Sequence, residues 1–223
     1  MKRALLSWSG GKDCAWALER LRGGPVKIEA LLTTINEQAN RVAMHGVRRE
    51  LIEEQANSIG IPPWIAPLPW PCPNVHYEQV MAEVCRRAVD DGIEAVVFGD
   101  LFLEDIRAYR ERMLAGTGLE PVFPLWGEPT DSLAREMITG GLRARLACID
   151  RKKLDVSFAG REFDARLLQT LPPEVDSCGE NGEFHSFVYD GPMFRRPIAV
   201  ESGVLREDGD FVFADLLCPV SSH

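Results

Sequence analysis

The residues whose types are best suited to binding or catalysis form a short polar segment, residues 9–14 (SGGKDC), directly after an apolar run. The apolar run predicts a buried strand, and residues 12–22 predict a helix. Glycines between a strand and a helix let backbone N–H groups approach an anion, and the helix dipole adds a positive field. The segment therefore predicts an anion-binding turn. Ser9 adds a hydroxyl donor, Lys12 a mobile cation, and Asp13 a carboxylate for a metal ion or for orienting the loop.

A simpler interpretation of this segment is a tight strand–helix turn whose polar residues are incidental. The segment matches neither the GxxxxGK[ST] pattern nor the GxGxxG pattern of other phosphate-binding turns. We favour the anion-binding interpretation because the glycine pair follows the first buried strand, where doubly wound sheets place such turns.

Two further polar groups are expected at the same edge of the sheet. His45 follows the second predicted strand, and Gly99 and Asp100 follow the fourth. Open α/β sheets bind ligands at the carboxyl ends of their strands. A glycine there allows close backbone approach, and Asp100 could serve Mg²⁺ or a polar ligand. Each group also has an ordinary alternative, since His45 could cap the following helix and Asp100 the end of its strand.

A second polar segment, residues 178–185 (CGENGEFH), combines two carboxylates, a thiol and an imidazole around two glycines. The glycines permit a tight loop, and the paired carboxylates Glu180 and Glu183 could bind an amine, a metal ion or a substrate cation. Taken alone, the segment is equally typical of a turn before a strand. Cys178 is not favoured as a nucleophile, because no partner can be assigned to it from the sequence.

The predicted elements divide the chain into two parts. The first part alternates strands with helices, which predicts an α/β fold with a doubly wound, mostly parallel sheet. The second part has mixed character, with a helix, a strand, a loop over 171–183, a strand over 184–190 and a hairpin, and predicts a smaller α+β C-terminal domain. We expect domains over residues 1–127 and 128–223. The strands of the first part are expected at 3–9, 27–35, 64–70, 94–98 and 121–126; its helices at 12–22, 47–59, 77–88 and 103–114.

Composition narrows the class of protein. The chain of 223 residues carries a formal charge of −9, which disfavours nucleic acid as a partner. No apolar window is long enough to span a membrane, and the first apolar run is too short for a signal peptide. Six cysteines without metal-ligand spacing predict reduced thiols in a cytoplasmic protein. Trp64, Trp70 and the prolines near them favour, by a little, an edge segment packed on a second subunit of a homodimer over a pocket wall.

Residues 9–13 resemble the SGGxDS signature of the PP-loop ATPases, although Cys14 stands where that family has serine. A thiol is a poorer donor than a hydroxyl. Together with 44–50 (MHGVRRE), 99–105 (GDLFLED) and 180–186 (ENGEFHS), the chain is similar to the PP-loop ATP-binding family that includes diphthine–ammonia ligase. In 180–183, Asn181 replaces one glycine of that family's Glu-Gly-Gly-Glu motif. The resemblance covers nearly the whole chain and is strongest to its short prokaryotic members.

The resemblance implies a fold of the HUP/PP-loop ATPase type, with ATP and Mg²⁺ as cofactors. Asp13 would hold the metal ion, Lys12 and Glu183 would be catalytic, and the loop at 178–185 would close over the site. The residues expected to bind ATP are Ser9, Gly10, Gly11, Lys12, Asp13, Cys14, His45, Gly99 and Asp100. The residues expected to bind the second substrate are Glu180, Asn181, Gly182, Glu183 and His185.

The leading functional hypothesis is an ATP-dependent ligase or amidase. It would adenylate a carboxylate on a small molecule or a protein side chain and transfer ammonia or an amine to it, releasing AMP and pyrophosphate. A tRNA-modifying PP-loop enzyme is the first alternative, disfavoured by the acidic charge and the lack of CxxC. A nucleotide-binding sensor without turnover is the second.

Overall fold

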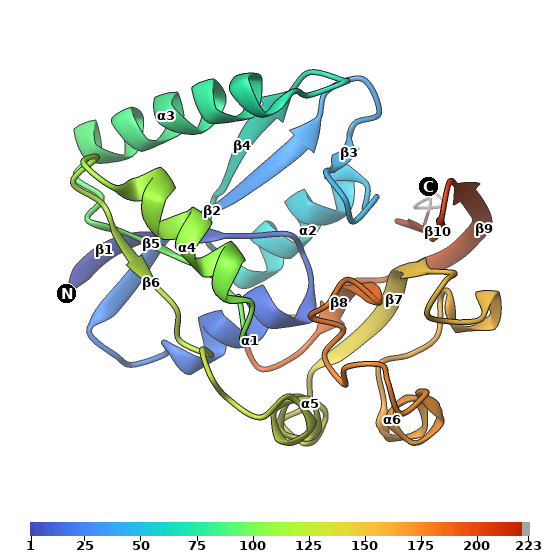
Figure 1. Ribbon diagram of the computed structural model, residues 1–223. Helices are drawn as coiled ribbons and strands as arrows, with labels where there is room; N and C mark the ends of the chain where they lie inside the picture. Colours follow the sequence, from blue (N-terminus) through green and yellow to red (C-terminus); the bar gives the residue numbers. More distant parts are fainter. Residues whose placement is uncertain (220–223) are drawn as a thin grey trace.

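Two β-sheets organise the chain in the computed structural model, which describes residues 1–219 (Figure 1). The first sheet has six strands and the second has four. The strands of the first sheet are β1 (Lys2–Ser7), β2 (Val26–Asn36), β3 (Arg41–Val42), β4 (Pro63–Leu68), β5 (Ala95–Val97) and β6 (Glu120–Val122). Figure 1 places this sheet and its helices on the left and the second sheet on the right.

The order of the parallel strands determines where along the edge of the first sheet a ligand can bind. Strands β4, β2, β1, β5 and β6 are paired in parallel in this order, and β3 runs antiparallel to the end of β2. From β1 the chain moves outward to β2 and β4, and it then returns to the other side of β1 as β5. Open sheets of this kind have a crevice at the carboxyl ends of the two strands between which the order reverses. The loops that follow β1 and β5 flank that crevice.

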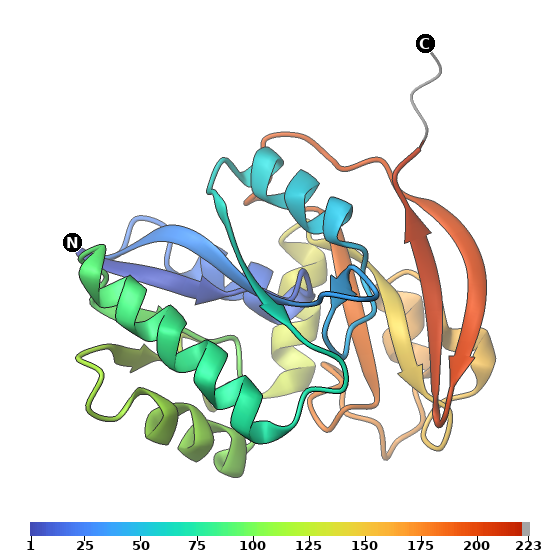
Figure 2. The same cartoon turned by 90° about the horizontal axis from the view of Figure 1, so that it is seen from above.

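Side chains alternate between the two faces of the first sheet, and helices cover both faces. In β1, Ala4 and Leu6 join one apolar cluster with α1 (Lys12–Arg20) and α2 (Arg49–Ile59). Leu5 joins the other cluster, which α3 (Asn74–Asp90) and α4 (Glu104–Leu114) cover. The view from above shows this layering (Figure 2). The prediction of a doubly wound, mostly parallel sheet is therefore confirmed.

The second sheet is antiparallel, with the order β8-β7-β10-β9. The predicted hairpin is present but starts later, because Ile198 is buried and its N–H bonds to the carbonyl of Tyr189. The short helix α6 was not predicted, since six residues are too few for a periodic pattern. The remaining elements are α5 (Thr130–Thr139), β7 (Arg143–Asp150), the 3₁₀ turn η1 (Val156–Phe158), α6 (Ala165–Thr170), β8 (Phe184–Asp190), β9 (Glu201–Asp208) and β10 (Phe211–Leu217).

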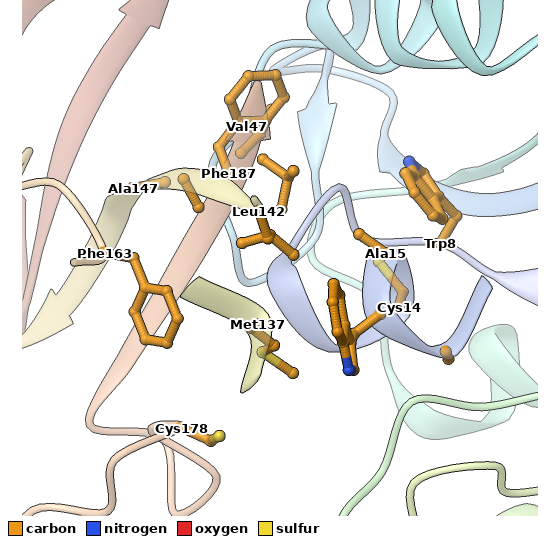
Figure 3. Packing of buried hydrophobic residues seen from close by; sticks show 14 of the residues in the cluster. Trp8, Cys14, Ala15, Val47, Met137, Leu142, Ala147, Phe163, Cys178 and Phe187 are labelled. Atoms are coloured by element: carbon orange, nitrogen blue, oxygen red, sulfur yellow. The ribbon is translucent and has the colours of Figure 1, made fainter. Parts of the chain in front are cut away.

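One apolar core runs from the first sheet into the second. Trp8 and Ala15 from the first part belong to the same buried cluster as Met137, Phe163 and Phe187 from the second (Figure 3). The expected boundary after residue 127 falls between β6 and α5. Because the core crosses this boundary, the two sheets hold each other in place. No helix among residues 1–219 combines the length and apolarity needed to span a membrane.

A buried glutamine links the two sheets at the loop that follows β1. Gln55 of α2 is fully buried and accepts a hydrogen bond of 2.8 Å from the indole N–H of Trp8. Its amide nitrogen donates to the carbonyl of Gly10 at 3.0 Å and to that of Val188 in β8 at 2.6 Å. The N–H of Val188 also donates to the Gly10 carbonyl, at 2.9 Å. All polar atoms of the Gln55 side chain are thus committed to joining β1, α2 and β8.

We predict that Gln55→Ala lowers the free energy of unfolding by about 2–4 kcal/mol, because it leaves the Trp8 N–H and the Val188 carbonyl buried without this partner. The matched control is Gln79→Ala on the exposed face of α3, which should change stability by less than about 0.5 kcal/mol. Chemical denaturation of both variants measures the difference. Equal stabilities of the two variants would contradict the proposed link.

Candidate functional site

The loop between β1 and α1 turns at Gly10, whose φ is +81°. A side chain at Gly10 would lie 2.7 Å from Ile52 Cδ1 and 2.9 Å from Gln55 Oε1, so only glycine fits this position. Gly11 has an ordinary φ of −87° and caps α1 without a side chain. A Cβ atom on Gly11 would lie 3.2 Å from the Ser186 carbonyl oxygen. Replacement of Gly10 would therefore disturb the fold as well as the loop, whereas replacement of Gly11 requires a smaller adjustment against the backbone of β8.

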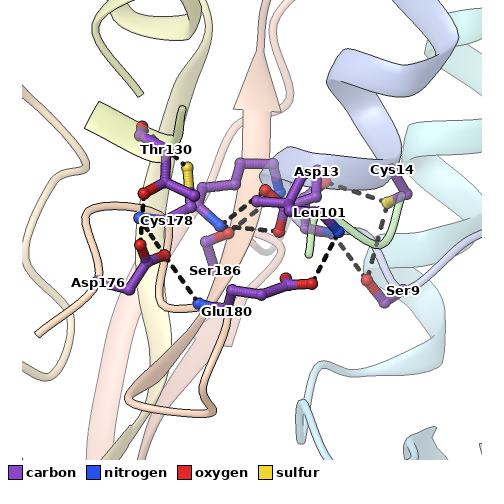
Figure 4. A network of polar contacts seen from close by, with 11 residues as sticks. Ser9, Asp13, Cys14, Leu101, Thr130, Asp176, Cys178, Glu180 and Ser186 are labelled. Atoms are coloured by element: carbon purple, nitrogen blue, oxygen red, sulfur yellow. Dashed lines mark hydrogen bonds and ion pairs between the residues drawn. The ribbon is translucent and has the colours of Figure 1, made fainter. Parts of the chain in front are cut away.

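Cys14 is turned toward the backbone of the loop. Its thiol donates to the Gly11 carbonyl at 3.1 Å and lies 3.7 Å from the hydroxyl of Ser9 (Figure 4). Burial raises the pKa of the Cys14 thiol, so it remains protonated. The side chain that departs from the SGGxDS signature thus makes a contact within the loop.

Lys12 is held in place, contrary to the expectation of a mobile cation. The side chain is 2% exposed, and its ammonium lies 2.9 and 2.8 Å from the two carboxylate oxygens of Asp13. It also lies 5.8 and 5.4 Å from the ring centroids of Phe163 and Phe184. Burial is the largest single influence and opposes the charge, but Asp13, Cys178 and Glu180 together raise the pKa of Lys12. Lys12 is therefore a fixed positive charge at the start of α1.

The end of β5 packs directly on this loop. A Cβ atom on Gly99 would lie 2.9 Å from the backbone of Asp13 and Cys14. Any residue larger than glycine at this position would therefore prevent the close approach of the two backbones. Asp100 is directed toward α4, where its carboxylate lies 3.6 Å from the Arg110 guanidinium. Gly99 is thus part of the crevice, and Asp100 lies at its margin.

The loop between α6 and β8 covers the crevice. The Asp176 carboxylate accepts hydrogen bonds from the N–H groups of Cys178 and Glu180, and from the hydroxyl of Thr130 in α5. The Glu180 carboxylate accepts a hydrogen bond of 2.7 Å from the N–H of Leu101, beyond β5 (Figure 4). The structure therefore brings residues 176–183 onto the loop that follows β5. Neither Thr130 nor Asp176 was singled out from the sequence, since no motif marks them.

The two glutamates of this loop have different surroundings. Burial and the nearby Asp13 carboxylate raise the pKa of Glu180 to about 7, although the hydrogen bond from Leu101 opposes this. Glu183 is 2% exposed and accepts hydrogen bonds from the Asp176 N–H and the Asn181 side chain within its own loop. Asn181 itself is exposed, and Gly182 forms the turn with a φ of +81°. Both hydrogen bonds to Glu183 reach Oε1, and its buried Oε2 has no hydrogen-bond partner among residues 1–219.

Two histidines from different sheets meet beside Lys12. His45 follows β3, His185 belongs to β8, and their ring centroids are 4.3 Å apart. Burial and the Lys12 charge lower the pKa of His185 to about 4. Burial, the neighbouring His185 ring and the Lys12 charge hold the pKa of His45 well below its usual value. Ser186, next to His185, accepts a hydrogen bond from the Lys12 N–H at 3.1 Å.

The turn that carries His45 is anchored to the second sheet. Asp215 of β10 is buried and accepts hydrogen bonds from Arg41 at 2.9 Å and from Arg48 at 2.9 and 2.7 Å. The hydrogen bond from Arg48 lowers the pKa of Asp215 to about 2, so this carboxylate stays ionised. A Cβ atom on Gly46 would lie 2.5 Å from the Phe213 ring, which requires glycine there.

Two cavities lie away from these loops. One of about 590 Å³ lies between α3 and α4 and includes Cys85 and Tyr109 in its lining, and one of about 490 Å³ includes Arg3 and Trp64. Neither is lined by a residue of the crevice. Titratable groups with perturbed pKa values gather at the crevice, which makes it the candidate site.

Comparison with known proteins also divides the chain into two successive parts. The family model described as the diphthamide synthase N-terminal domain matches residues 1–121, and that of the diphthamide synthase C-terminal domain matches residues 129–215. The chain is 30% identical over 115 residues to the diphthine–ammonia ligase of Mus musculus, covering 49% of this chain and 43% of that protein. It is 29% identical over 130 residues to that of Danio rerio, covering 55% of this chain and 50% of that protein. The match thus spans half or less of these relatives' length.

Among solved structures, the chain is similar to the crystal structure of a predicted subunit of tRNA methyltransferase from Methanocaldococcus jannaschii. The identity is 15% and the TM-score 0.48, with 86% of this chain and 98% of that chain covered. The two family models match successive parts of the chain that contain the first and the second sheet, and the resemblance stated from the sequence motifs is confirmed. The chain therefore belongs to the diphthamide synthase family.

Proposed function

We propose that this protein is an ATP-dependent ligase that adenylates a carboxylate and then joins the resulting acyl group to ammonia or an amine. Pyrophosphate is released in the first step and AMP in the second. The observation that carries this proposal is the glycine turn at the reversal of strand order, covered by a loop with a titratable carboxylate. The relatives named diphthine–ammonia ligase support the same reaction class. The acceptor would be a small molecule or a protein side chain.

The loop after β1 fits the pyrophosphate portion of ATP. The Gly10 carbonyl is bound from inside the protein by Gln55 and Val188. Because the N–H of a trans peptide points opposite to its carbonyl, the N–H of Gly11 is directed away from these partners. The start of α1 adds its dipole, and Lys12 adds a fixed positive charge. A pyrophosphate at this loop would compete with the Ser9 hydroxyl for the Gly11 N–H, which lies 3.4 Å from that oxygen, and with the Asp13 carboxylate for the Lys12 ammonium.

Asp13 is the residue that fits Mg²⁺ at this loop. A magnesium ion bound with a nucleotide takes one or two protein carboxylates and completes its shell with phosphate oxygens and water. The Asp13 side chain is about a quarter exposed (27%), and both its oxygens contact the Lys12 ammonium, so Mg²⁺ would share this carboxylate with Lys12. Mg²⁺ would neutralise part of the phosphate charge.

The proposed reaction has two displacements. In the first, a carboxylate oxygen attacks the α-phosphorus, the bond from this phosphorus to the bridging oxygen breaks, and pyrophosphate leaves with the electron pair. In the second, the amine nitrogen attacks the acyl carbon, the bond to AMP breaks, and the nitrogen loses a proton. Glu180, with its pKa near 7, is suited to accept that proton. The loop at 176–183 would exclude water from the acyl adenylate.

A nucleotide-binding sensor without turnover is the second candidate function. The observation that favours it is the Lys12–Asp13 ion pair, which commits both side chains to each other. A sensor would bind ATP without forming AMP, so product analysis separates the two candidates.

We predict that Gly11→Val weakens ATP binding by about 100-fold or more, because its Cβ would already lie 3.2 Å from the Ser186 carbonyl and 3.3 Å from the Ser9 hydroxyl and the branched side chain would crowd the loop. The control is Gly24→Val, at the far end of α1. There a Cβ atom would lie 3.1 Å from a backbone carbonyl, as close a contact as at Gly11. Calorimetric titration with Mg·ATP measures affinity, and thermal unfolding checks the fold. Unchanged affinity in folded Gly11→Val would refute the nucleotide site.

Turnover is expected to yield AMP and pyrophosphate in equal amounts, since the loop fits two terminal phosphates that leave as a unit. Fractions of a metabolite extract can supply the unknown acceptor, with AMP followed by chromatography. Formation of ADP and phosphate as the acceptor-dependent products would disprove an adenylation mechanism.

The acceptor-dependent rate should rise with pH through about 7, since Glu180 is protonated below its pKa and accepts a proton only when ionised. Glu180→Gln should remove this rise and lower the rate by about 10²-fold or more. ATP affinity should change by a few-fold at most, because glutamine keeps an acceptor for the Leu101 N–H. In Glu183→Gln the rise should persist. Loss of the rise in Glu183→Gln alone would reverse the assignment.

A further inference from the structure

Two arginines of α4 have no function in the reaction as described so far. Arg107 and Arg110 are three positions apart, so their side chains are neighbours on one face of the helix. The guanidinium carbon of Arg107 lies 4.9 Å from the ring centroid of Phe123 and 4.8 Å from that of Trp126. The guanidinium carbon of Arg110 lies 5.1 Å from the ring centroid of Phe98. Contact with an aromatic face stabilises and orients a guanidinium group.

The three aromatic rings form a layer at the carboxyl ends of β5 and β6. Phe98 directly follows β5, and Phe123 directly follows β6. Their ring centroids are 5.5 Å apart with planes inclined by 24°, and the ring centroid of Trp126 is 5.9 Å from that of Phe123. Phe98 is buried, and its N–H donates to the Val122 carbonyl at 2.9 Å. The layer therefore holds both guanidinium groups at the edge where open α/β sheets bind ligands.

Both guanidinium groups have N–H donors that no group within residues 1–219 accepts. Nε of Arg107 donates to Glu111 at 2.8 Å, and Nε of Arg110 lies 3.6 Å from the Asp100 carboxylate. Within the described residues, the terminal nitrogens of both side chains make no hydrogen bond and are not buried, so a ligand can reach them. The terminal N–H groups of arginine form a planar fork that matches the two oxygens of a carboxylate.

One short segment, residues 99–101, lies between the two arginines and the proposed nucleotide turn. Gly99 packs on the backbone of that turn, whereas the Asp100 carboxylate is directed toward Arg110. Leu101 carries the contact with the covering loop. A substrate group held by the arginines would therefore lie next to the candidate site, but it would not be the group that reacts with ATP.

We propose that Arg107 and Arg110 bind a second carboxylate of the acceptor, one that is not adenylated, so that the acceptor is a dicarboxylic acid. The proposal rests on the proposed function, in which one acceptor carboxylate reacts with ATP beside the turn at residues 9–14. Asp100 and Glu111 already balance the two positive charges of the arginines. A singly charged carboxylate therefore fits better than a phosphate group, whose second negative charge would have no partner.

NMR of the guanidinium Nε–H groups in the full chain, labelled with ¹⁵N-arginine, tests the site. Arg107→Lys and Arg110→Lys assign the two signals, and the exposed Arg112 of the same helix is the internal control. Propionate, added at constant ionic strength, should shift both signals with half-saturation at about 10 mM or lower. It should leave the Arg112 signal in place, and neutral propionamide should move none of the three.

Other outcomes of this titration overturn the proposal. The absence of a shift at Arg107 and Arg110, or an equal shift at Arg112, would show that no carboxylate site exists there. Inorganic phosphate that shifts the two signals at lower concentration than propionate would refute the choice of a carboxylate. The backbone amide of Gly11 reports separately on the proposed function. If Mg·ATP shifts it while the arginines ignore propionate, only the arginine site is disproved.

Kinetics test whether the bound carboxylate belongs to the acceptor. With an extract fraction that supports AMP formation, Arg107→Lys and Arg110→Lys should each raise the acceptor KM by about 10-fold, because lysine keeps the charge but loses the fork. The kcat and the KM for ATP should change by less than about twofold. The control Arg112→Lys should leave all three constants unchanged, and thermal unfolding checks that each variant is folded.

A fall in kcat with an unchanged acceptor KM would contradict a binding role for the two arginines. Identification of the acceptor in that fraction as a monocarboxylic acid would overturn the substrate class.

Discussion

The carbonyl oxygen of Gly10 is the acceptor on which the site depends. It receives hydrogen bonds from the side chain of Gln55 in α2 and from the N–H of Val188 in β8. These two donors hold the turn in the conformation that only glycine adopts without strain, and the next N–H, that of Gly11, points away from them and donates to the Ser9 hydroxyl. The second sheet is thus part of the phosphate-binding turn.

Burial between the sheets gives the crevice its electrostatic character. The low-dielectric surroundings disfavour charge, which raises the pKa of Glu180 to about 7 and lowers that of His185 to about 4. Lys12 keeps its charge because Asp13 lies within 3 Å of its ammonium. The crevice therefore holds the Lys12–Asp13 ion pair, a carboxylate whose pKa is about 7, and two uncharged imidazoles. This combination is suited to a reaction that binds anionic phosphates and later removes a proton.

The covering loop acquires its shape from α5 and from its own side chains. Asp176 binds two backbone N–H groups and Thr130, and Glu183 bonds the Asp176 N–H from within. The loop is therefore already ordered, and Glu180 reaches the Leu101 N–H as a consequence. The two glutamates of the segment are only three residues apart but have different partners. Glu180 accepts a hydrogen bond from the Leu101 N–H beyond β5, whereas Glu183 accepts one from the Asp176 N–H within its own loop.

Local pattern and the rule for parallel sheets were sufficient to predict the doubly wound sheet and the glycine turn. A strand, a glycine pair and a helix start are adjacent in the chain, and strands that alternate with helices place their carboxyl ends at one edge. Only the tertiary structure decided that Gly10 bonds Val188, that Lys12 bonds Ser186, and that His45 meets His185. These partners are between 140 and 178 positions apart, so no periodicity relates them. The raised pKa of Glu180 and the fixed position of Lys12 depend on burial, which is created when the two sheets pack together.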